Sequence, residues 1–294
     1  MTDFIKQVAA FNNNNDCFLL NDGNKIPCIG FGTWKIKDSE NGADIVSEAI
    51  KAGFRHFDTA ARYKSEGSVG EAIKKSGISR DQFFVTTKVW KDDITPKAAR
   101  TSLEGSLRDL QSNYVDLLLI HWPKASRHDN NWQEKVAQTW QEFIKFKQEG
   151  LVKSIGVANF LPHHLKALQS DVLPCLDQIE FHVGYLQPEI YQYCQEHNIL
   201  VEGWRPLGQG ALLNSPTVLK LAQKYNKQVA QILLRFCLDL GVLPIPKTTN
   251  YDRMLCNKDV FDFKLSSDDI KILKDMPLCG WSGEHPDDHI PGDD

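Results

Sequence analysis

Residues 53–63 read GFRHFDTAARY, a stretch that changes from apolar to polar within a few positions. Phe54 and Phe57 belong to a short run that is typical of the end of a buried strand. The carboxylate of Asp58 follows directly, and the phenol of Tyr63 comes five residues later. Asp and Thr are common in turns, so ordinary loop chemistry is one explanation. The other explanation is that the end of this strand forms the floor of an active site.

The same change from an apolar run to polar residues recurs along the chain. Eight apolar runs are predicted as strands, at residues 29–32, 54–57, 83–88, 115–121, 154–157, 177–180, 200–203 and 243–245. Amphipathic stretches are predicted as helices, at residues 39–52, from Thr95 onward, and at 132–148, 162–169, 188–197, 215–225, 228–240 and 250–257. Strand followed by helix, repeated, requires parallel strands with helical crossovers. Eight such units favour an α/β fold of the closed (β/α)8 TIM-barrel type over an open doubly wound sheet.

The first residues of the chain precede this alternation. Residues 1–16 contain a run of asparagines and are predicted to form a flexible polar arm or a short capping helix. Residues 17–20 and 25–28 flank Asp22 and Gly23, a pair that is typical of a hairpin turn. We therefore expect an N-terminal β-hairpin that plugs one end of the barrel. Residues 17–294 are expected to form one barrel domain, since barrels of this kind reach this length.

The composition argues against several classes of protein. Hydrophobic residues make up 41% of the chain and charged residues 24%, as in ordinary globular proteins. A formal net charge of -4 with dispersed basic residues argues against nucleic-acid binding. No apolar run is long enough to span a bilayer, and the N-terminus lacks the features of a signal peptide. We expect a cytoplasmic protein with a small-molecule substrate, most simply a monomer, with a dimer as the alternative.

Metal binding and disulfides are not expected. The seven cysteines are widely spaced and never form a C-x-x-C pair, so they are predicted to be free thiols. His163 and His164 are adjacent, and neighbours on one helix are not expected to converge on one ion. Neither an H-E-x-x-H motif nor a Cys/His set is present in the sequence.

Polar residues after the predicted strands are candidates for catalysis, because the carboxyl ends of the strands carry the active site in TIM barrels. Asp58 and Tyr63 follow the second strand, Lys88 ends the third and His121 ends the fourth. A nearby ammonium lowers the pKa of a tyrosine, which is otherwise about 10, and a carboxylate compensates a buried ammonium. Neutral His121 can orient a carbonyl oxygen. Each residue alone has a structural explanation, but their coincidence suits protonation of a carbonyl while hydride reaches its carbon.

Several motifs in order resemble the aldo-keto reductase family. They are residues 53–73, 87–90 (TKVW), 116–123 (DLLLIHWP), 155–160 (IGVANF), 178–182 (QIEFH) and 245–247 (IPK). The resemblance covers nearly the whole chain, and it implies NADPH-dependent reduction of aldehydes and ketones in a (β/α)8 barrel. It also implies that Tyr63 donates the proton, that Asp58 and Lys88 tune it, and that His121 orients the carbonyl.

The resemblance implies a nicotinamide site as well. Asn159 and Gln178 match the positions that hold the carboxamide, and Trp204 matches the aromatic residue that stacks on the ring. Tryptophan here is similar to the microbial branch that includes 2,5-diketo-D-gluconic acid reductases. Arg205 replaces the serine that is usual in the family, so it is expected either to touch the pyrophosphate or to form an outward salt bridge.

The phosphates of a dinucleotide need side-chain cations and loop amides, since the chain has neither G-x-G-x-x-G nor a P-loop. Lys247 and Arg253 match the family's 2′-phosphate contacts, and Asn257 matches an adenine contact. Two cations there favour NADPH over NADH. The other positions expected to contact the cofactor are Thr33, Trp34, Asp58, Leu207, Gln209 and Thr248.

Three tryptophans are candidates for the substrate site. Trp34, Trp90 and Trp122 follow the first, third and fourth strands, and by resemblance the first and last line the pocket. Aromatic walls favour small apolar or flat carbonyl compounds, although tryptophan is often only packing. The short tail after Leu265 predicts an open pocket.

Three alternative functions remain at this point. A cofactor-binding regulatory barrel with little turnover is opposed by the intact set of four catalytic candidates. A short-chain dehydrogenase would need Y-x-x-x-K, which the sequence lacks. A metal-dependent barrel hydrolase would need a cluster of metal ligands.

Overall fold

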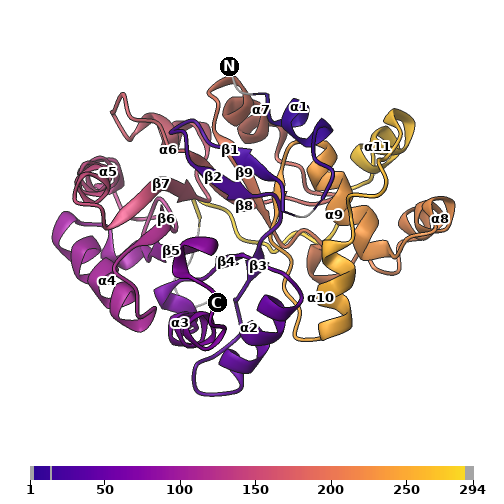
Figure 1. The fold of residues 1–294 in the computed structure, drawn as a ribbon. Coiled ribbons are helices and arrows are strands. Elements are labelled where there is room, and N and C mark those ends of the chain that lie inside the picture. The colour runs from indigo at the N-terminus through magenta and orange to yellow at the C-terminus, as the bar shows by residue number, and fades with distance from the viewer. Residues whose placement is uncertain (1–2, 14, 289–294) are drawn as a thin grey trace.

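Eight parallel strands form a (β/α)8 barrel in the computed structural model, which describes residues 3–13 and 15–288 (Figure 1). The strands are β3 (Phe31–Gly32), β4 (His56–Asp58), β5 (Phe84–Val89), β6 (Val115–Ile120), β7 (Val152–Ala158), β8 (Leu176–Glu180), β9 (Leu200–Trp204) and β10 (Leu243–Pro244). Each strand pairs in parallel with the next along the chain. Backbone hydrogen bonds of 3.1 Å from Gly30 N to Pro244 O and from Gly32 N to Pro246 O join the first strand to the last. The predicted barrel is confirmed.

Helices surround the barrel (Figure 1). They are α2 (Gly42–Lys51), α3 (Glu66–Lys75), α4 (Pro96–Asp109), α5 (Trp132–Gln148), α6 (Pro162–Lys166), α7 (Pro188–Glu196), α8 (Pro216–Tyr225), α9 (Val229–Asp239), α10 (Tyr251–Lys258) and α11 (Ser267–Lys274). Helices α4, α6, α7 and α8 begin with proline, which fits the first position because it needs no N–H partner there. Within the described residues, no helix combines the length and apolar character needed to cross a bilayer.

Helix α11 was not predicted, and two further elements differ from the sequence-based expectation in ways that have a physical cause. Helix α3 was not predicted, because its glycines lower helix propensity. Gly70 is required there because a Cβ atom would lie 2.5 Å from the carbonyl oxygen of Leu110. Strand β7 begins at Val152, ahead of the predicted start, because the charged Lys153 interrupts the apolar run while its Nζ reaches Asp116 Oδ1 at 3.0 Å.

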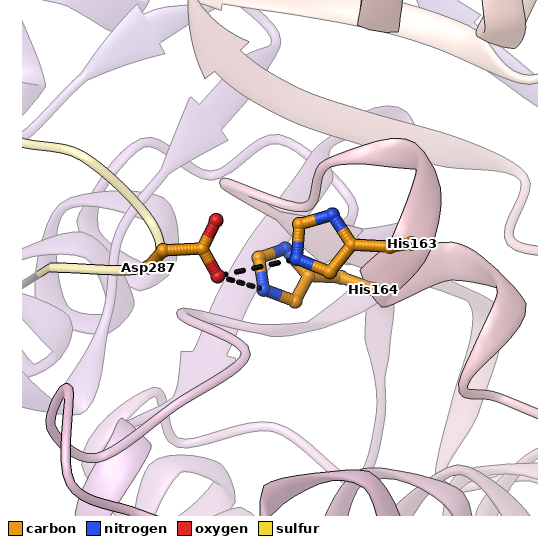
Figure 2. Close-up of side chains that lie close together, drawn as sticks. All are labelled: His163, His164 and Asp287. Carbon is orange, nitrogen blue, oxygen red and sulfur yellow. Dashed lines mark hydrogen bonds and ion pairs between the residues drawn. The ribbon is translucent and has the colours of Figure 1, made fainter.

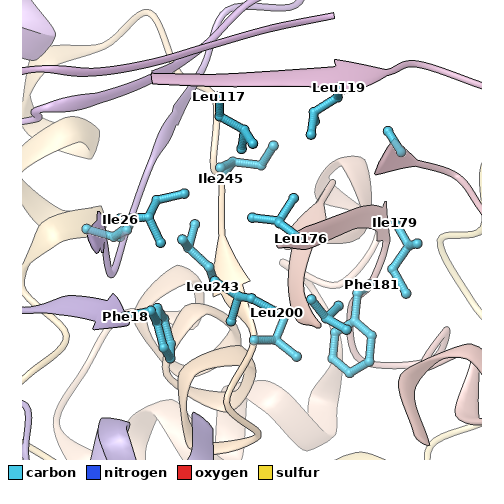
Figure 3. Close-up of a cluster of buried hydrophobic side chains, with 14 of the residues drawn as sticks. Phe18, Ile26, Leu117, Leu119, Leu176, Ile179, Phe181, Leu200, Leu243 and Ile245 are labelled. Atoms are coloured by element: carbon cyan, nitrogen blue, oxygen red, sulfur yellow. The ribbon is translucent and has the colours of Figure 1, made fainter. Parts of the chain in front are cut away.

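The predicted hairpin plug is confirmed. Strands β1 (Cys17–Leu19) and β2 (Lys25–Pro27) pair antiparallel, and Phe18 and Ile26 are buried with the barrel core (Figure 3). Asn21 Nδ2 donates to Pro174 O at 2.8 Å, just before β8 begins. The hairpin therefore closes the amino end of the barrel and leaves the carboxyl end for chemistry. All seven cysteines are free thiols.

A short helix covers the outside of this region. Helix α1 (Phe4–Ala9) is capped by the Asp3 carboxylate, which accepts a 3.0 Å hydrogen bond from Lys6 N. Phe4 and Val8 are buried, and the helix packs against α9. Burial of these two apolar side chains holds the helix against the barrel.

Candidate active site

Four side chains meet at the carboxyl end of the barrel. Asp58 ends β4, Lys88 lies on the neighbouring strand β5, Tyr63 ends the short turn η1 (Ala61–Tyr63), and His121 directly follows β6. Lys88 Nζ lies 2.7 Å from Asp58 Oδ1 and 3.3 Å from Tyr63 Oη. Tyr63 Oη lies 3.3 Å from His121 Nε2. The structure thus brings together all four predicted catalytic residues, called the tetrad below.

The Lys88 ammonium keeps its charge although its side chain is buried. Burial by itself lowers the pKa of an amine, but the charge of Asp58 and the phenol of Tyr63 outweigh it, so the pKa of Lys88 is raised above its ordinary value. The carbonyl oxygen of Thr59 accepts a further hydrogen bond of 2.9 Å from Nζ. A charged Lys88 beside the Tyr63 oxygen stabilises the phenolate form.

Threonine and serine hydroxyls hold the end of β4 in place. Thr33 Oγ1 donates to the carbonyl oxygen of Asp58 at 2.9 Å and lies 2.8 Å from Ser65 Oγ. The same Ser65 Oγ lies 2.8 Å from Thr59 Oγ1. The Thr33 hydroxyl is thus engaged with the backbone of Asp58, and a cofactor contact by Thr33 stays a prediction.

The residues predicted at the nicotinamide lie beside the tetrad. Gln178 Nε2 donates to Asp58 Oδ1 at 2.7 Å. Asn159 Nδ2 donates to His121 O at 3.0 Å, and Asn159 Oδ1 accepts a 2.9 Å bond from Trp204 Nε1. These bonds fix both amide planes, because amide nitrogen donates and amide oxygen accepts.

Arg205 lies across two of the predicted aromatic residues. Its guanidinium carbon is 5.3 Å from the Trp204 ring centroid and 5.7 Å from that of Trp34. Its Nη1 lies 4.0 Å from Glu180 Oε1. Arg205 forms a salt bridge, but toward buried Glu180 and not outward as expected, and contact with pyrophosphate stays a prediction.

The residues predicted at the phosphates lie between β10 and the start of α10. Thr248 Oγ1 accepts from Asn250 N at 3.2 Å, and Asn250 Oδ1 caps α10 by accepting from Arg253 N at 2.9 Å. Burial and the nearby charge of Lys35 lower the pKa of Lys247. An anion placed here would relieve the repulsion between the two lysines.

The remaining candidates for cofactor contact differ in exposure. Asn257 is buried on α10. Leu207 packs against the core, while Gln209 is exposed in the turn η4 (Gly208–Gly210), where its φ is 52°. The η4 turn follows β9, whereas Asn257 lies on the separate helix α10.

The three predicted substrate tryptophans have different neighbours. Trp90 packs edge-on against the His121 ring, with centroids 5.0 Å apart. Trp122 lines a small pocket next to Asn159. Trp34 lies under the Lys35 ammonium, 4.2 Å from the ring centroid, as well as under Arg205.

Residues 281–288, called the tail below, reach the carboxyl end of the barrel. The amide of Ser282 donates to Glu180 Oε1 at 3.0 Å, and its hydroxyl donates to Glu180 Oε2 at 2.6 Å. Glu284 and Pro286 line the same small pocket as Trp122. A short tail predicts an open pocket, whereas the structure places two tail residues in its wall.

The tail is anchored by an Asp287 cluster (Figure 2). His163 Nε2 and His164 Nε2 each lie 3.1 Å from Asp287 Oδ1, and Lys124 Nζ lies 3.6 Å from it. Adjacent histidines were not expected to converge on one ion; in the structure they converge on one carboxylate, because Asp287 comes from the distant tail. Leu161 N donates to His164 Nδ1 at 3.0 Å, which leaves the proton of neutral His164 on Nε2, facing Asp287. A metal at this Nε2 would require the opposite tautomer, so the bonding favours a hydrogen-bonded anchor in which Lys124 supplies the positive charge.

Asp287→Ala is expected to release the tail and weaken substrate binding. Loss of a charged hydrogen-bond acceptor of this kind costs about 1–3 kcal/mol, so KM should rise about tenfold while kcat changes little. Steady-state kinetics and limited proteolysis of the tail would measure the effect, with Asp288→Ala as the neighbouring control. An unchanged KM and an unchanged cleavage rate would show that the cluster does not hold the tail.

Sequence reasoning missed two buried acids in this region. Glu180 lies within the QIEFH motif and had no predicted role, yet it binds the tail and Arg205. Glu202 was part of a predicted strand without any role, yet its Oε2 accepts a 2.6 Å bond from Gln178 Nε2. The available signal was a glutamate inside an otherwise apolar strand, since buried carboxylates are rare unless they are paired.

The barrel, the tetrad at its carboxyl end and the surrounding amides define a class of carbonyl oxidoreductases. The chain belongs to the aldo/keto reductase family, whose model matches residues 28–276. It is therefore an oxidoreductase that acts on carbonyl groups.

Individual relatives agree with this assignment. The chain is 38% identical over 275 residues to a glyoxal reductase of Bacillus subtilis (strain 168), covering 93% of this chain and 97% of the relative. It is 38% identical over 272 residues to the methylglyoxal reductase DkgA of Escherichia coli (strain K12), covering 91% and 96%. A solved aldo-keto reductase from Bombyx mori in complex with NADP is 36% identical, with a TM-score of 0.80 and coverage of 88% and 91%. The similarity to the microbial branch predicted from Trp204 is confirmed.

Proposed function

We propose that the protein uses NADPH to reduce aldehydes and ketones to alcohols, with Tyr63 as the general acid. The observation that carries this proposal is the contact of the Tyr63 hydroxyl with both Lys88 Nζ and His121 Nε2, each at 3.3 Å. The first contact supplies a positive charge to stabilise phenolate, and the second places a hydrogen-bonding ring where a carbonyl oxygen would approach.

The residues around the tetrad fit a nicotinamide dinucleotide. The amide nitrogen of Gln178 donates to Asp58. Its oxygen Oε1 is then left to accept a hydrogen bond from the amide N–H of the nicotinamide carboxamide. Asn159 keeps a second donor hydrogen, and Trp204 supplies an aromatic face. At the other end, the nearness of two cations, Lys247 and Lys35, supports binding of the 2′-phosphate there. The bound NADP of the Bombyx mori relative supports this choice of cofactor.

In the proposed reaction, bound NADPH supplies a hydride, and thus both electrons, to the carbonyl carbon. Tyr63 transfers its phenolic proton to the carbonyl oxygen, so the C=O bond becomes an alcohol and the phenol becomes phenolate. Lys88 stabilises that phenolate, and Asp58 keeps Lys88 in place at 2.7 Å. The phenolate of Tyr63 then takes up one proton from the solvent, which restores the site.

Small dicarbonyl compounds are the proposed substrate class. The glyoxal and methylglyoxal reductases among the relatives act on compounds of this kind by name. Trp122, Tyr185 and Trp204 lie together beside Asn159, and aromatic side chains of this kind suit a flat carbonyl compound.

The test is NADPH oxidation followed by absorbance, with glyoxal, methylglyoxal, simple aldehydes and keto-sugars as the panel. We expect turnover with NADPH and fastest turnover with the dicarbonyl compounds. The alternative is a cofactor-binding regulatory barrel, and tight NADPH binding without turnover across the panel would favour it. The cytoplasmic location, the monomeric state and the division of the chain after residue 16 stay predictions from the sequence.

Cofactor selectivity should depend on the cations at the start of α10. Replacing both Lys247 and Arg253 by alanine removes charged hydrogen bonds to the 2′-phosphate, each worth about 1.5–3 kcal/mol. NADPH binding should weaken at least about a hundredfold, and NADH binding should hardly change. Fluorescence titration with both cofactors measures this, with exposed Lys220 on α8 replaced by alanine as control. Equal losses for NADPH and NADH would reject the 2′-phosphate assignment.

A further inference from the structure

A second carboxyl group, Glu202, lies inside the barrel beneath the tetrad. It is on β9 next to β8, and its side chain is fully buried. Gln178 Nε2 donates to Glu202 Oε2 at 2.6 Å and to Asp58 Oδ1 at 2.7 Å, so one amide group binds two carboxyl groups. An amide has two N–H bonds, and both are used here. The two acids are therefore neighbours, and their charges would repel each other.

The surroundings of Glu202 do not favour a second negative charge. The titratable groups facing it are His56 and Asp58 from β4, Lys88 from β5 and the thiol of Cys175 before β8. Lys88 is the only full cation among them, and its Nζ already binds both oxygens of Asp58, at 2.7 and 2.8 Å.

His56 does not supply the missing positive charge. Burial, together with repulsion from Lys88, lowers the pKa of His56 to about 3, so its ring is neutral at neutral pH. Its Nε2 lies 3.6 Å from Glu202 Oε1 and 3.1 Å from Thr86 Oγ1. Glu202 Oε1 has no hydrogen-bond partner within residues 3–13 and 15–288. An ionised carboxylate would leave that oxygen unsatisfied, which is costly in a buried site.

We propose that Glu202 is a positioning residue of the reductase: as an uncharged carboxyl group it holds the Gln178 amide and leaves Asp58 as the sole anion beside Lys88. This inference rests on the function proposed above. The burial of Glu202, together with the charge of Asp58, raises its pKa to about 8, in agreement with an uncharged group at neutral pH.

Ionisation of Glu202 would make Tyr63 a weaker proton donor. A second negative charge near Lys88 reduces the positive potential at the Tyr63 oxygen, so phenolate becomes less stable and Tyr63 gives up its proton less readily. Since Glu202 loses its proton as pH rises, kcat should fall on the alkaline side, with an apparent pKa near 8. His56 is neutral throughout this range and does not contribute.

The experiment compares the pH dependence of kcat for the wild-type protein, Glu202→Gln and Glu202→Met. Both variants are uncharged at all pH values, so the alkaline fall in kcat should move upward by at least about one pH unit. The matched control is Asp177→Asn on β8, another buried carboxyl group, whose Oδ1 lies near Phe160 N rather than near the tetrad. This control should keep the wild-type alkaline limb. An alkaline limb at the same pH in the wild-type protein and in both Glu202 variants would overturn the inference while leaving the reductase function intact.

A second measurement does not depend on turnover. A folded-state pKa above the ordinary value of an acid means that stability falls as pH rises between those two values and is constant above the higher one. For Glu202 the window runs from 4.5 to about 8. The melting temperature of the wild-type protein relative to Glu202→Gln should decline across that window, and a constant difference would overturn the uncharged state. Absence of wild-type turnover, by contrast, would reject the proposed function itself.

Discussion

Replacing Tyr63 by phenylalanine is expected to reduce kcat by about 10²–10⁴-fold, the usual contribution of a general acid, while NADPH still binds. The ring stays, with Lys88 Nζ 4.7 Å from its centroid, but the hydroxyl that contacts Lys88 and His121 is lost. Without that proton, charge that develops on the carbonyl oxygen is not neutralised. Stopped-flow NADPH oxidation would measure the loss, and fluorescence titration would measure cofactor binding.

Tyr191→Phe is the matched control for this variant. The Tyr191 hydroxyl donates a 2.6 Å hydrogen bond to Leu240 O, away from the tetrad, so its removal should lower stability slightly and leave kcat unchanged. If Tyr63→Phe retained wild-type turnover, Tyr63 would not be the acid. If it also lost NADPH binding, the loss of rate would reflect an altered cofactor site instead.

Replacing Lys88 by methionine is expected to affect both stability and turnover. The substitution leaves the buried Asp58 carboxylate without its cation, and breaking such a buried pair costs about 3–5 kcal/mol. Turnover should fall as well, because phenolate at Tyr63 loses the nearby positive charge. Denaturant unfolding and steady-state kinetics would give the two quantities separately.

The double variant Lys88→Met with Asp58→Asn separates the two effects. Without Lys88 the unpaired charge of Asp58 is the main cost, so the neutral amide should recover most of the stability, to within about 1–2 kcal/mol of the wild-type protein. Turnover should remain low, because the ammonium is still missing. Recovery of both properties would mean that Lys88 serves only to neutralise Asp58, and recovery of neither would mean that packing of the long side chain dominates.

Much of the site was predictable because the ends of strands can be recognised in a sequence. Asp58, Lys88 and His121 each follow or end an apolar run, and parallel strands place such positions at one end of a barrel. The amides of Asn159 and Gln178 were predicted from the resemblance to the family, which also supplied their expected partner. Their bonds to His121 and Asp58 came only from the structure.

The tail and the buried acids could not be predicted in this way. Asp287 meets His163 and His164 across more than one hundred residues, and no local pattern encodes which distant side chain will complete a cluster. The position of Glu202 in a strand could be predicted from the sequence. Its protonation state could not, because it depends on the charges of Asp58 and Lys88 across the barrel.

The sequence by itself determined the order of the strands, the barrel class and the types of residue at each strand end, because periodicity and turn chemistry act over a few neighbouring residues. The tertiary structure alone decided which charges face one another, how Gly70 meets Leu110 and where the tail is anchored. These depend on packing and on electrostatic interactions between segments far apart in the chain. The energies of such interactions are set only when the barrel closes and excludes water.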